Sequence, residues 1–278
     1  MGDGLFCRGP DIKSKLDNKK KSTKRNQPIL MTSQDVMNFI GNVEPFWLRN
    51  IHESVNTNGS ETLRETPSLS SSSPSTPLSY IDGVIVINLD RRTDRREHIA
   101  TQLMKLDVNP RKVFRLSASE GGCAGCLKSH TRALVFAMKK QWKNVLILED
   151  DFEFDTTLSM NEILSRMNEF HITHQHDYGF VQLASLISHA VKITPTLSYV
   201  LSATNAAGYV VNERIIPYLI QVFIPGIEPL AKTNQHWIWQ NDVLWNKVRS
   251  VFPTYAFTPP LGTQYLNYSD LSNMVIKK

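Results

Sequence analysis

The chain of 278 residues has only three cysteines and no long uninterrupted apolar segment. The cysteines Cys7, Cys123 and Cys126 are odd in number and make no disulfide framework, which suits a reducing compartment. No window approaches the roughly 18 consecutive apolar residues of a transmembrane helix. The first residues also lack the apolar run of a secretory signal peptide. We therefore expect a soluble, cytoplasmic protein without a membrane span.

Cys123 and Cys126 are spaced as C-x-x-C, a pattern found in redox sites and in half of many zinc sites. The sequence has no second cysteine pair to complete such a zinc site. A redox pair would normally open the helix after the first strand of a thioredoxin-like unit. We therefore predict that these two cysteines bind no zinc and form no necessary disulfide.

The excess positive charge is confined to the beginning of the chain. Residues 1–25 contain eight Lys and Arg against three Asp, an excess of five that equals the net charge of the whole chain. The remainder is balanced, so we expect no nucleic-acid partner. A basic tail can make peripheral contact with a membrane surface or an acidic partner, although a solvated run is the commoner interpretation.

Composition divides the chain near residue 80. Residues 68–79 are rich in Ser and Pro and predict a flexible linker, and residues 11–27 are polar and Lys-rich, which predicts disorder. Apolar spacing predicts short helices within residues 33–56, the second of them beginning at Pro45. We therefore predict a partly disordered tail over residues 1–79 and one domain over residues 80–278.

The second part of the chain alternates between strand and helix patterns. Residues 84–89 (VIVINL) form a continuous β-branched run, typical of a strand buried on both faces. Further strands are predicted at residues 113–116, 145–148 and 180–183, and helices at residues 93–106, 126–140, 158–170 and 212–222. This alternation predicts an α/β domain with a mainly parallel sheet. Ligands of such sheets bind at the carboxyl ends of the strands.

Two charged clusters stand at predicted strand ends. Asn88 is followed by four arginines over residues 91–96, including Arg92 and Arg95, which suit a pyrophosphate because guanidinium groups match phosphate oxygens. The alternative is a solvated helix start with ordinary surface ion pairs. Glu149, Asp150 and Asp151 follow the third strand, and three adjacent carboxylates favour a Mg²⁺ or Mn²⁺ ion. The alternative here is an acidic loop facing water.

Three further segments are candidates for ligand contact. Glycines precede Ser129 and His130, which lie one turn into a predicted helix and face either a ligand or the core. Residues 204–209 are small and predict a loop packed against a ligand. Asp242 lies among tryptophans in residues 237–245, which suits a sugar site. The alternative for Asp242 is a core helix with one capping or paired acid.

Together these segments resemble the family 25 glycosyltransferases, which include lipopolysaccharide sugar transferases and collagen hydroxylysine galactosyltransferases. The resemblance covers roughly the last two hundred residues, the size of one domain. Its motifs occur in family order: Asn88, Leu89, Arg92, Asp94 and Arg95; Gly125, Cys126, Ser129 and His130; Leu148, Glu149, Asp150 and Asp151; Ala207, Gly208 and Tyr209; Asp242; and Pro260, Leu261 and Gln264. Cys123 departs from the family, which has an acidic residue at this position.

The resemblance implies a GT-A fold, in which a Rossmann-like nucleotide-sugar domain is joined to an acceptor half. It implies inverting transfer of a hexose from a UDP-sugar to a hydroxyl of a glycan, a lipopolysaccharide-type acceptor or a protein hydroxylysine. Asp151 and Glu149 would hold Mn²⁺ or Mg²⁺, and Asp242 would be the general base. The donor would be bound by Asn88, Arg92, Arg95, Ser129, His130, Glu149 and Asp150.

Two alternatives remain from the sequence. One is another metal-dependent, nucleotide-using transferase such as a nucleotidyltransferase, which would need the acidic trio but gives no role to Ser129, His130 or Asp242. The other is a degenerate glycosyltransferase that serves as a binding module. Degeneracy should remove acidic residues, and all three of Glu149, Asp150 and Asp151 are present.

Overall fold

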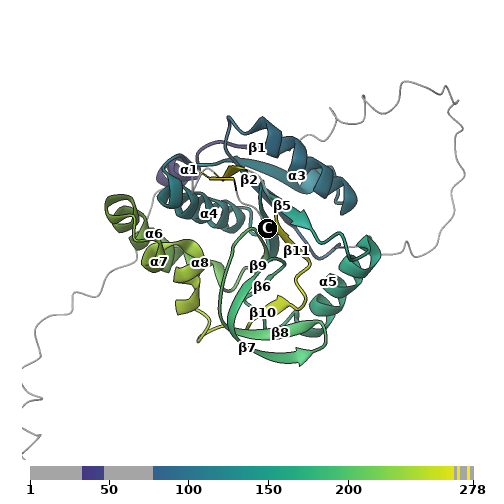
Figure 1. Ribbon diagram of the computed structural model, residues 1–278. Helices are drawn as coiled ribbons and strands as arrows, with labels where there is room; N and C mark the ends of the chain where they lie inside the picture. The colour runs from purple at the N-terminus through teal and green to yellow at the C-terminus, as the bar shows by residue number, and fades with distance from the viewer. Residues whose placement is uncertain (1–32, 47–77, 266–267, 270–273, 276–278) are drawn as a thin grey trace, which may run out of the picture.

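The computed structural model of the chain describes residues 33–46, 78–265, 268–269 and 274–275 (Figure 1). Its centre is a nine-stranded sheet of order β1-β3-β2-β4-β9-β6-β10-β8-β7. The strands are β1 (Val43–Pro45), β2 (Gly83–Asn88), β3 (Val113–Ser117), β4 (Asn144–Glu149), β6 (Phe180–Gln182), β7 (Leu186–Thr194), β8 (Leu197–Thr204), β9 (Gly208–Asn212) and β10 (Thr254–Phe257). Small two-stranded sheets pair β5 (Phe152–Phe154) with β11 (Gly262–Gln264) and β12 (Tyr268–Ser269) with β13 (Met274–Val275).

Helices cover both faces of the large sheet (Figure 1). The helices are α1 (Ser33–Ile40), α3 (Thr93–Lys105), η2 (Pro110–Lys112), α4 (Gly122–Lys139), α5 (Met160–His174), α6 (Ile216–Thr233), α7 (His236–Trp239), α8 (Asn241–Leu244) and η3 (Trp245–Lys247). Because successive side chains of a strand point to opposite faces, Val84 and Val86 of β2 pack with α3 and α5. Ile85 and Ile87 pack with α4 and α6. All six residues of β2 are buried, as the β-branched run predicted.

The α/β class is confirmed, but the sheet is mixed rather than mainly parallel. Only the pairings β2·β3, β2·β4 and β6·β10 are parallel, and the other five are antiparallel. The main cause is β9, which runs antiparallel between β4 and β6. Residues 204–209 were predicted as a loop before a helix, whereas Gly208 begins this strand. Its aromatic and β-branched residues are buried on both faces, which favours a strand.

Residues 33–46 belong to the same folded body as the large sheet. Helix α1 was predicted and packs against α4, whereas Pro45 ends strand β1 instead of starting a second helix. Strand β1 adds to the sheet edge beside β3, antiparallel, with Glu44 opposite Arg115. The exposed edge of a sheet suits a proline, because one side needs no N–H donor. The predicted tail over residues 1–32, the helix over residues 47–56 and most of the linker lie outside the described residues.

No described helix is both long and apolar enough to cross a membrane. Helix α6 is the most apolar of the long helices, but it contains Pro225 and Pro229. Its face toward the sheet carries Leu219 and Phe223, which pack into the core beneath α4. The predicted helix over residues 212–222 therefore exists, but begins four residues later, because residues 208–212 form β9.

Candidate functional site

A cleft opens at the carboxyl ends of β2 and β4. These strands are parallel neighbours, so the segments that follow them meet at one edge of the sheet. The lining comes from the end of β2 and the residues after it (Ile87, Leu89 and Arg91), Arg95 of α3, the loop over residues 118–121, Gly122, Cys126, Ser129 and His130 of α4, Glu149 at the end of β4 with Asp150 and Asp151 after it, and Gln264 of β11. The cleft therefore unites the predicted arginine, glycine-helix and acidic segments.

Asn88 connects the two strand ends. Its Nδ2 donates to Asp150 Oδ2 at 2.7 Å and to the Arg92 carbonyl at 3.0 Å. Its Oδ1 accepts from Arg115 Nε at 2.9 Å. Asn88 is fully buried, so these bonds replace the water that its amide loses on folding. Asn88 therefore acts through Asp150 and the start of α3.

Arg95 points inward from the first turns of α3 and pairs with two of the three acids. Its Nη1 lies 3.1 Å from Asp150 Oδ1 and 3.0 Å from Asp151 Oδ2. All three side chains are about nine-tenths buried. A guanidinium thus offsets part of the repulsion between these carboxylates. From the sequence, we expected a metal ion alone to offset this repulsion.

The neutralisation by Arg95 is incomplete. Burial raises the pKa of Asp150 despite the opposing effects of Arg95 and Asn88. Burial, together with the charge of Glu149, raises the pKa of Asp151 to about 8, although Arg95 acts in the opposite direction. Among the described residues, Asp151 Oδ1 is a buried oxygen with no hydrogen-bond partner. A buried carboxylate oxygen that lacks a donor fits a divalent cation, because such ions prefer oxygen ligands.

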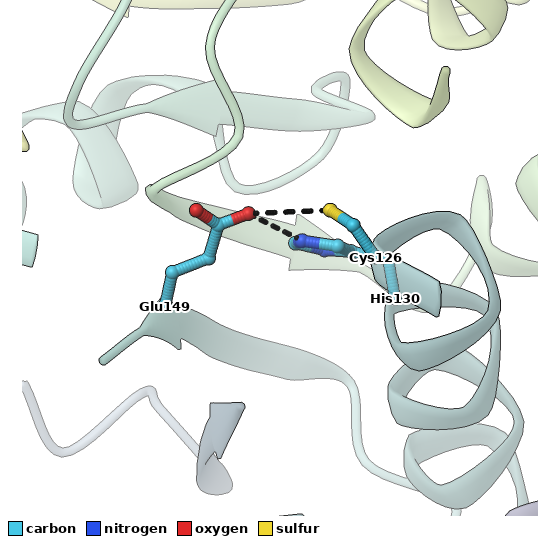
Figure 2. A group of neighbouring side chains, drawn as sticks. All are labelled: Cys126, His130 and Glu149. Atoms are coloured by element: carbon cyan, nitrogen blue, oxygen red, sulfur yellow. Dashed lines mark hydrogen bonds and ion pairs between the residues drawn. The ribbon is translucent and has the colours of Figure 1, made fainter. Parts of the chain in front are cut away.

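Glu149 faces the opposite way, toward α4 (Figure 2). Its Oε1 lies 2.8 Å from His130 Nε2 and 3.7 Å from Cys126 Sγ. His130 Nδ1 in turn lies 3.0 Å from the Tyr209 hydroxyl. Burial acts to raise the pKa of Glu149, but the bond and charge of His130, with help from Cys126 and Arg95, outweigh it and lower the pKa. The predicted acidic trio is therefore divided between two sets of partners.

Ser129 forms hydrogen bonds with two backbone groups beside the cleft. Its hydroxyl donates to the Gly125 carbonyl at 2.7 Å and accepts from the Ser119 N–H at 2.8 Å. The loop that it holds passes very close to α4, since a Cβ on Gly125 would lie 2.3 Å from the Ser119 carbonyl oxygen. Gly121 has a φ of 108°, which favours glycine. The glycines and Ser129 therefore shape one wall of the cleft.

Arg92 and Asp242 do not line the cleft. Arg92 donates to both carboxylate oxygens of Asp94, at 2.9 and 2.8 Å, and this pair holds the pKa of Asp94 at about 2. Asp242 Oδ2 accepts from the Asn205 N–H at 2.9 Å. Burial raises the pKa of Asp242, and the charge of Glu149 adds to this effect. Asp242 thus lies near Glu149 and also anchors the turn between β8 and β9.

Sequence reasoning gave no site role to two residues of this region, Arg115 and Tyr209. Arg115 is buried on β3 and connects Asn88 with Glu44 of β1, at 2.8 Å from the Glu44 carboxylate. Tyr209 is buried on β9 and orients His130. Arg115 is a charged residue inside an otherwise apolar strand over residues 113–117, and this position was a signal that its side chain has a buried partner. No local signal connected Tyr209 with His130, because 79 residues separate them.

Comparison with protein-family models and with curated proteins gave no match for this chain. Among solved structures, it is similar to UDP-glucose pyrophosphorylase complexed with UDP-glucose, with a TM-score of 0.38 and 8% identity over 63% of this chain and 72% of that chain. It is also similar to mannose-1-phosphate geranyltransferase from Thermus thermophilus, with a TM-score of 0.32 and 5% identity over 65% of this chain and 58% of that chain. Likenesses this distant say nothing of the reaction.

Proposed function

We propose that the chain is a metal-dependent glycosyltransferase that transfers a hexose from a UDP-sugar to a hydroxyl acceptor. The observation that carries this proposal is the convergence on one cleft of Arg95, His130 and Asp151, which come from three separate sequence motifs. The same motifs, in the same order, underlie the resemblance to family 25 glycosyltransferases. A nucleotidyltransferase would need the acidic residues but would leave the glycine-helix segment without a role.

Asp151 is the residue that we assign to the divalent ion, Mn²⁺ or Mg²⁺. The support is its buried Oδ1, which has no hydrogen-bond partner among the described residues. Its raised pKa indicates that a positive charge is still needed there. A bound ion of this kind would supply Lewis-acid stabilisation of the departing diphosphate. Glu149 contributes only if its second oxygen turns to the same ion, because Oε1 is engaged by His130.

Arg91 and Arg95 are the cations that line the cleft, and we assign them to the diphosphate. Arg95 already orients Asp150 and Asp151, so one guanidinium would serve both the acids and the donor. Arg91 forms an ion pair with Glu120 of the loop before α4. Arg92, by contrast, is directed to Asp94, and we expect it to stabilise the start of α3.

Asp242 is the proposed general base that takes the proton from the acceptor hydroxyl. Its raised pKa brings the carboxyl closer to the range in which a base is effective near neutral pH. Its bond to the Asn205 N–H uses Oδ2 and would orient the side chain. The cleft itself encloses only about 120 Å³, below the roughly 300 Å³ of the smallest usual ligand pockets. The sugar and the acceptor would therefore extend out of it.

Calorimetric titration of the full chain with UDP, with and without Mn²⁺, tests the proposal. We expect UDP to bind more tightly with Mn²⁺, and Asp151→Asn to remove this dependence. Asp107→Asn, an exposed substitution on the loop after α3, is the matched control. A screen of UDP-sugars for release of UDP then tests turnover. Failure of UDP to bind under either condition would contradict the proposal, and release of pyrophosphate from UTP would favour the nucleotidyltransferase alternative.

A further inference from the structure

Three chemically different side chains meet where α4 approaches the end of β4 (Figure 2). Cys126 and His130 are four residues apart on α4, so they lie on the same face of the helix. Glu149 enters from the end of β4. Their potential ligand atoms all lie within 4.8 Å of one another. Figure 2 shows Glu149 Oε1 directed at both the thiol and the imidazole, and its second oxygen turned away from them.

We propose that Cys126, His130 and Glu149 bind a borderline-soft divalent ion of the Zn²⁺ type. A thiolate, an imidazole and a carboxylate are the ligands that Zn²⁺ takes in proteins, whereas Mn²⁺ and Mg²⁺ prefer oxygen. This site goes beyond the proposed function and differs from the Asp151 position in its ligand chemistry. It also revises the sequence-based prediction for Cys126. The missing ligands come from His130 and Glu149 rather than from a second cysteine pair.

The surroundings of His130 resemble those of a metal-binding histidine. A ligand histidine usually bonds through its other ring nitrogen to a partner that fixes the ring. Here the Tyr209 hydroxyl lies 3.0 Å from Nδ1, and Nε2 faces the cluster. When Nε2 binds the ion, the ring proton resides on Nδ1 and is donated to the Tyr209 oxygen. The His130 side chain is fully buried, so this orientation is held by packing as well.

The charges around the thiol favour a cation. The Glu149 carboxylate brings a negative charge into the cluster, directly beside the thiol. Without an ion, the single S–H proton faces two acceptors, Glu149 Oε1 and Asn241 Oδ1, each at 3.7 Å. Binding of the ion releases the thiol proton to solvent and forms the metal–sulfur bond, so the step requires no oxidant.

The fourth position of a tetrahedral site is available at the cleft side of the cluster. All three ligands line the cleft, so a water molecule can reach the ion. Asn241 Oδ1 is the protein candidate for this position, and Asn241 Nδ2 is buried without a hydrogen-bond partner among the described residues. At usual Zn²⁺ distances, the nitrogen and oxygen ligands stand roughly 3.3 Å apart. The 2.8 Å contact between His130 and Glu149 therefore has to open slightly.

Co²⁺ is a spectroscopic substitute for Zn²⁺ that reports its ligands directly. We expect metal-free full-length protein to bind a first equivalent of Co²⁺ at this cluster, with the visible bands of a four-coordinate ion and a near-ultraviolet charge-transfer band from the thiolate. Zn²⁺ should remove both signals by competition. Cys126→Ser should abolish the charge-transfer band, whereas Cys123→Ser, which changes the neighbouring half-buried thiol, should retain it.

Two further variants test whether Co²⁺ binds at this cluster rather than at Asp151. Tyr209→Phe keeps the buried ring but removes the bond to His130, so it should weaken Co²⁺ binding by about 10- to 100-fold while the charge-transfer band persists. Asp151→Asn should leave the Co²⁺ spectrum unchanged. Absence of the charge-transfer band in the folded wild type, or its persistence in Cys126→Ser, would overturn the proposal. In that case the three side chains form only a hydrogen-bonded group, and Mn²⁺-dependent UDP binding would still support the proposed function independently.

Discussion

The side-chain amide of Asn88 donates a 2.7 Å hydrogen bond to the carboxylate of Asp150 and thereby joins the ends of β2 and β4. Both residues are buried, and both also connect to α3, through the Arg92 carbonyl and the Arg95 guanidinium. The floor of the cleft is therefore a single polar network in which each member orients the next.

Asn88→Ala should destabilise the fold by about 2–3 kcal/mol, because it leaves buried polar partners without their hydrogen bonds. Those partners include Asp150 and Arg115. Urea unfolding with two-state analysis measures the change. Thr101→Ala, at an exposed position of α3, is the control and should alter stability by less than about 0.5 kcal/mol. If both substitutions changed the free energy of unfolding by the same amount, the hydrogen bonds of Asn88 would not contribute to stability.

Arg95→Met should cost about 3–5 kcal/mol at pH 8, because two buried carboxylates lose their cation. The cost should shrink as the pH falls below about 8, because Asp151, whose pKa is about 8, then gains a proton and loses the charge that Arg95 offsets. Urea unfolding at several pH values measures this trend. The exposed Arg111→Met serves as control. A cost that does not depend on pH would mean that Arg95 contributes packing rather than charge.

Metal-free protein should become less stable as pH rises from about 4 to 8. The pKa of Asp151 is about 8 in the folded protein against an ordinary 3.8, so within this window the folded state binds the extra proton. Asp151→Asn should flatten the dependence and raise stability at pH 8. Mn²⁺ should reverse the trend for the wild type, because binding requires the ionised carboxylate. Thermal melting with EDTA or Mn²⁺ measures both effects, and an unchanged slope in Asp151→Asn would contradict them.

Removal of residues 1–46 should lower the melting temperature, whereas removal of residues 1–32 should not. The longer deletion exposes core beneath Ile40 and Phe46, each of which contributes roughly 1.5–3 kcal/mol by burial. It also removes the ion pair between Glu44 and Arg115 and the hydrogen bond from Arg132 to the Ile40 carbonyl. Calorimetry of the two truncated proteins decides the point. Equal melting temperatures would mean that β1 is an accessory to the domain.

Asp242→Asn should reduce kcat for transfer to acceptor by about 10²- to 10⁴-fold if Asp242 is the general base. The amide still accepts the Asn205 N–H bond, so the turn and UDP binding should persist. A rise in KM with a nearly unchanged kcat would instead limit Asp242 to anchoring that turn. Both parameters are measured with one working acceptor, and UDP affinity is the internal control.

The sequence by itself determined the elements with strong local periodicity and the strand ends at which the candidate site lies. Buried β-branched runs identify β2 and β4 wherever they pair, and their parallel pairing carries Asn88 and Asp150 to one edge. Only the tertiary structure decided the insertion of β9, the inward turn of Arg95 and the meeting of Cys126, His130 and Glu149. Periodicity reports which face of an element is apolar. The partner of a strand or a charged side chain depends on packing between distant segments, which no local window of sequence contains.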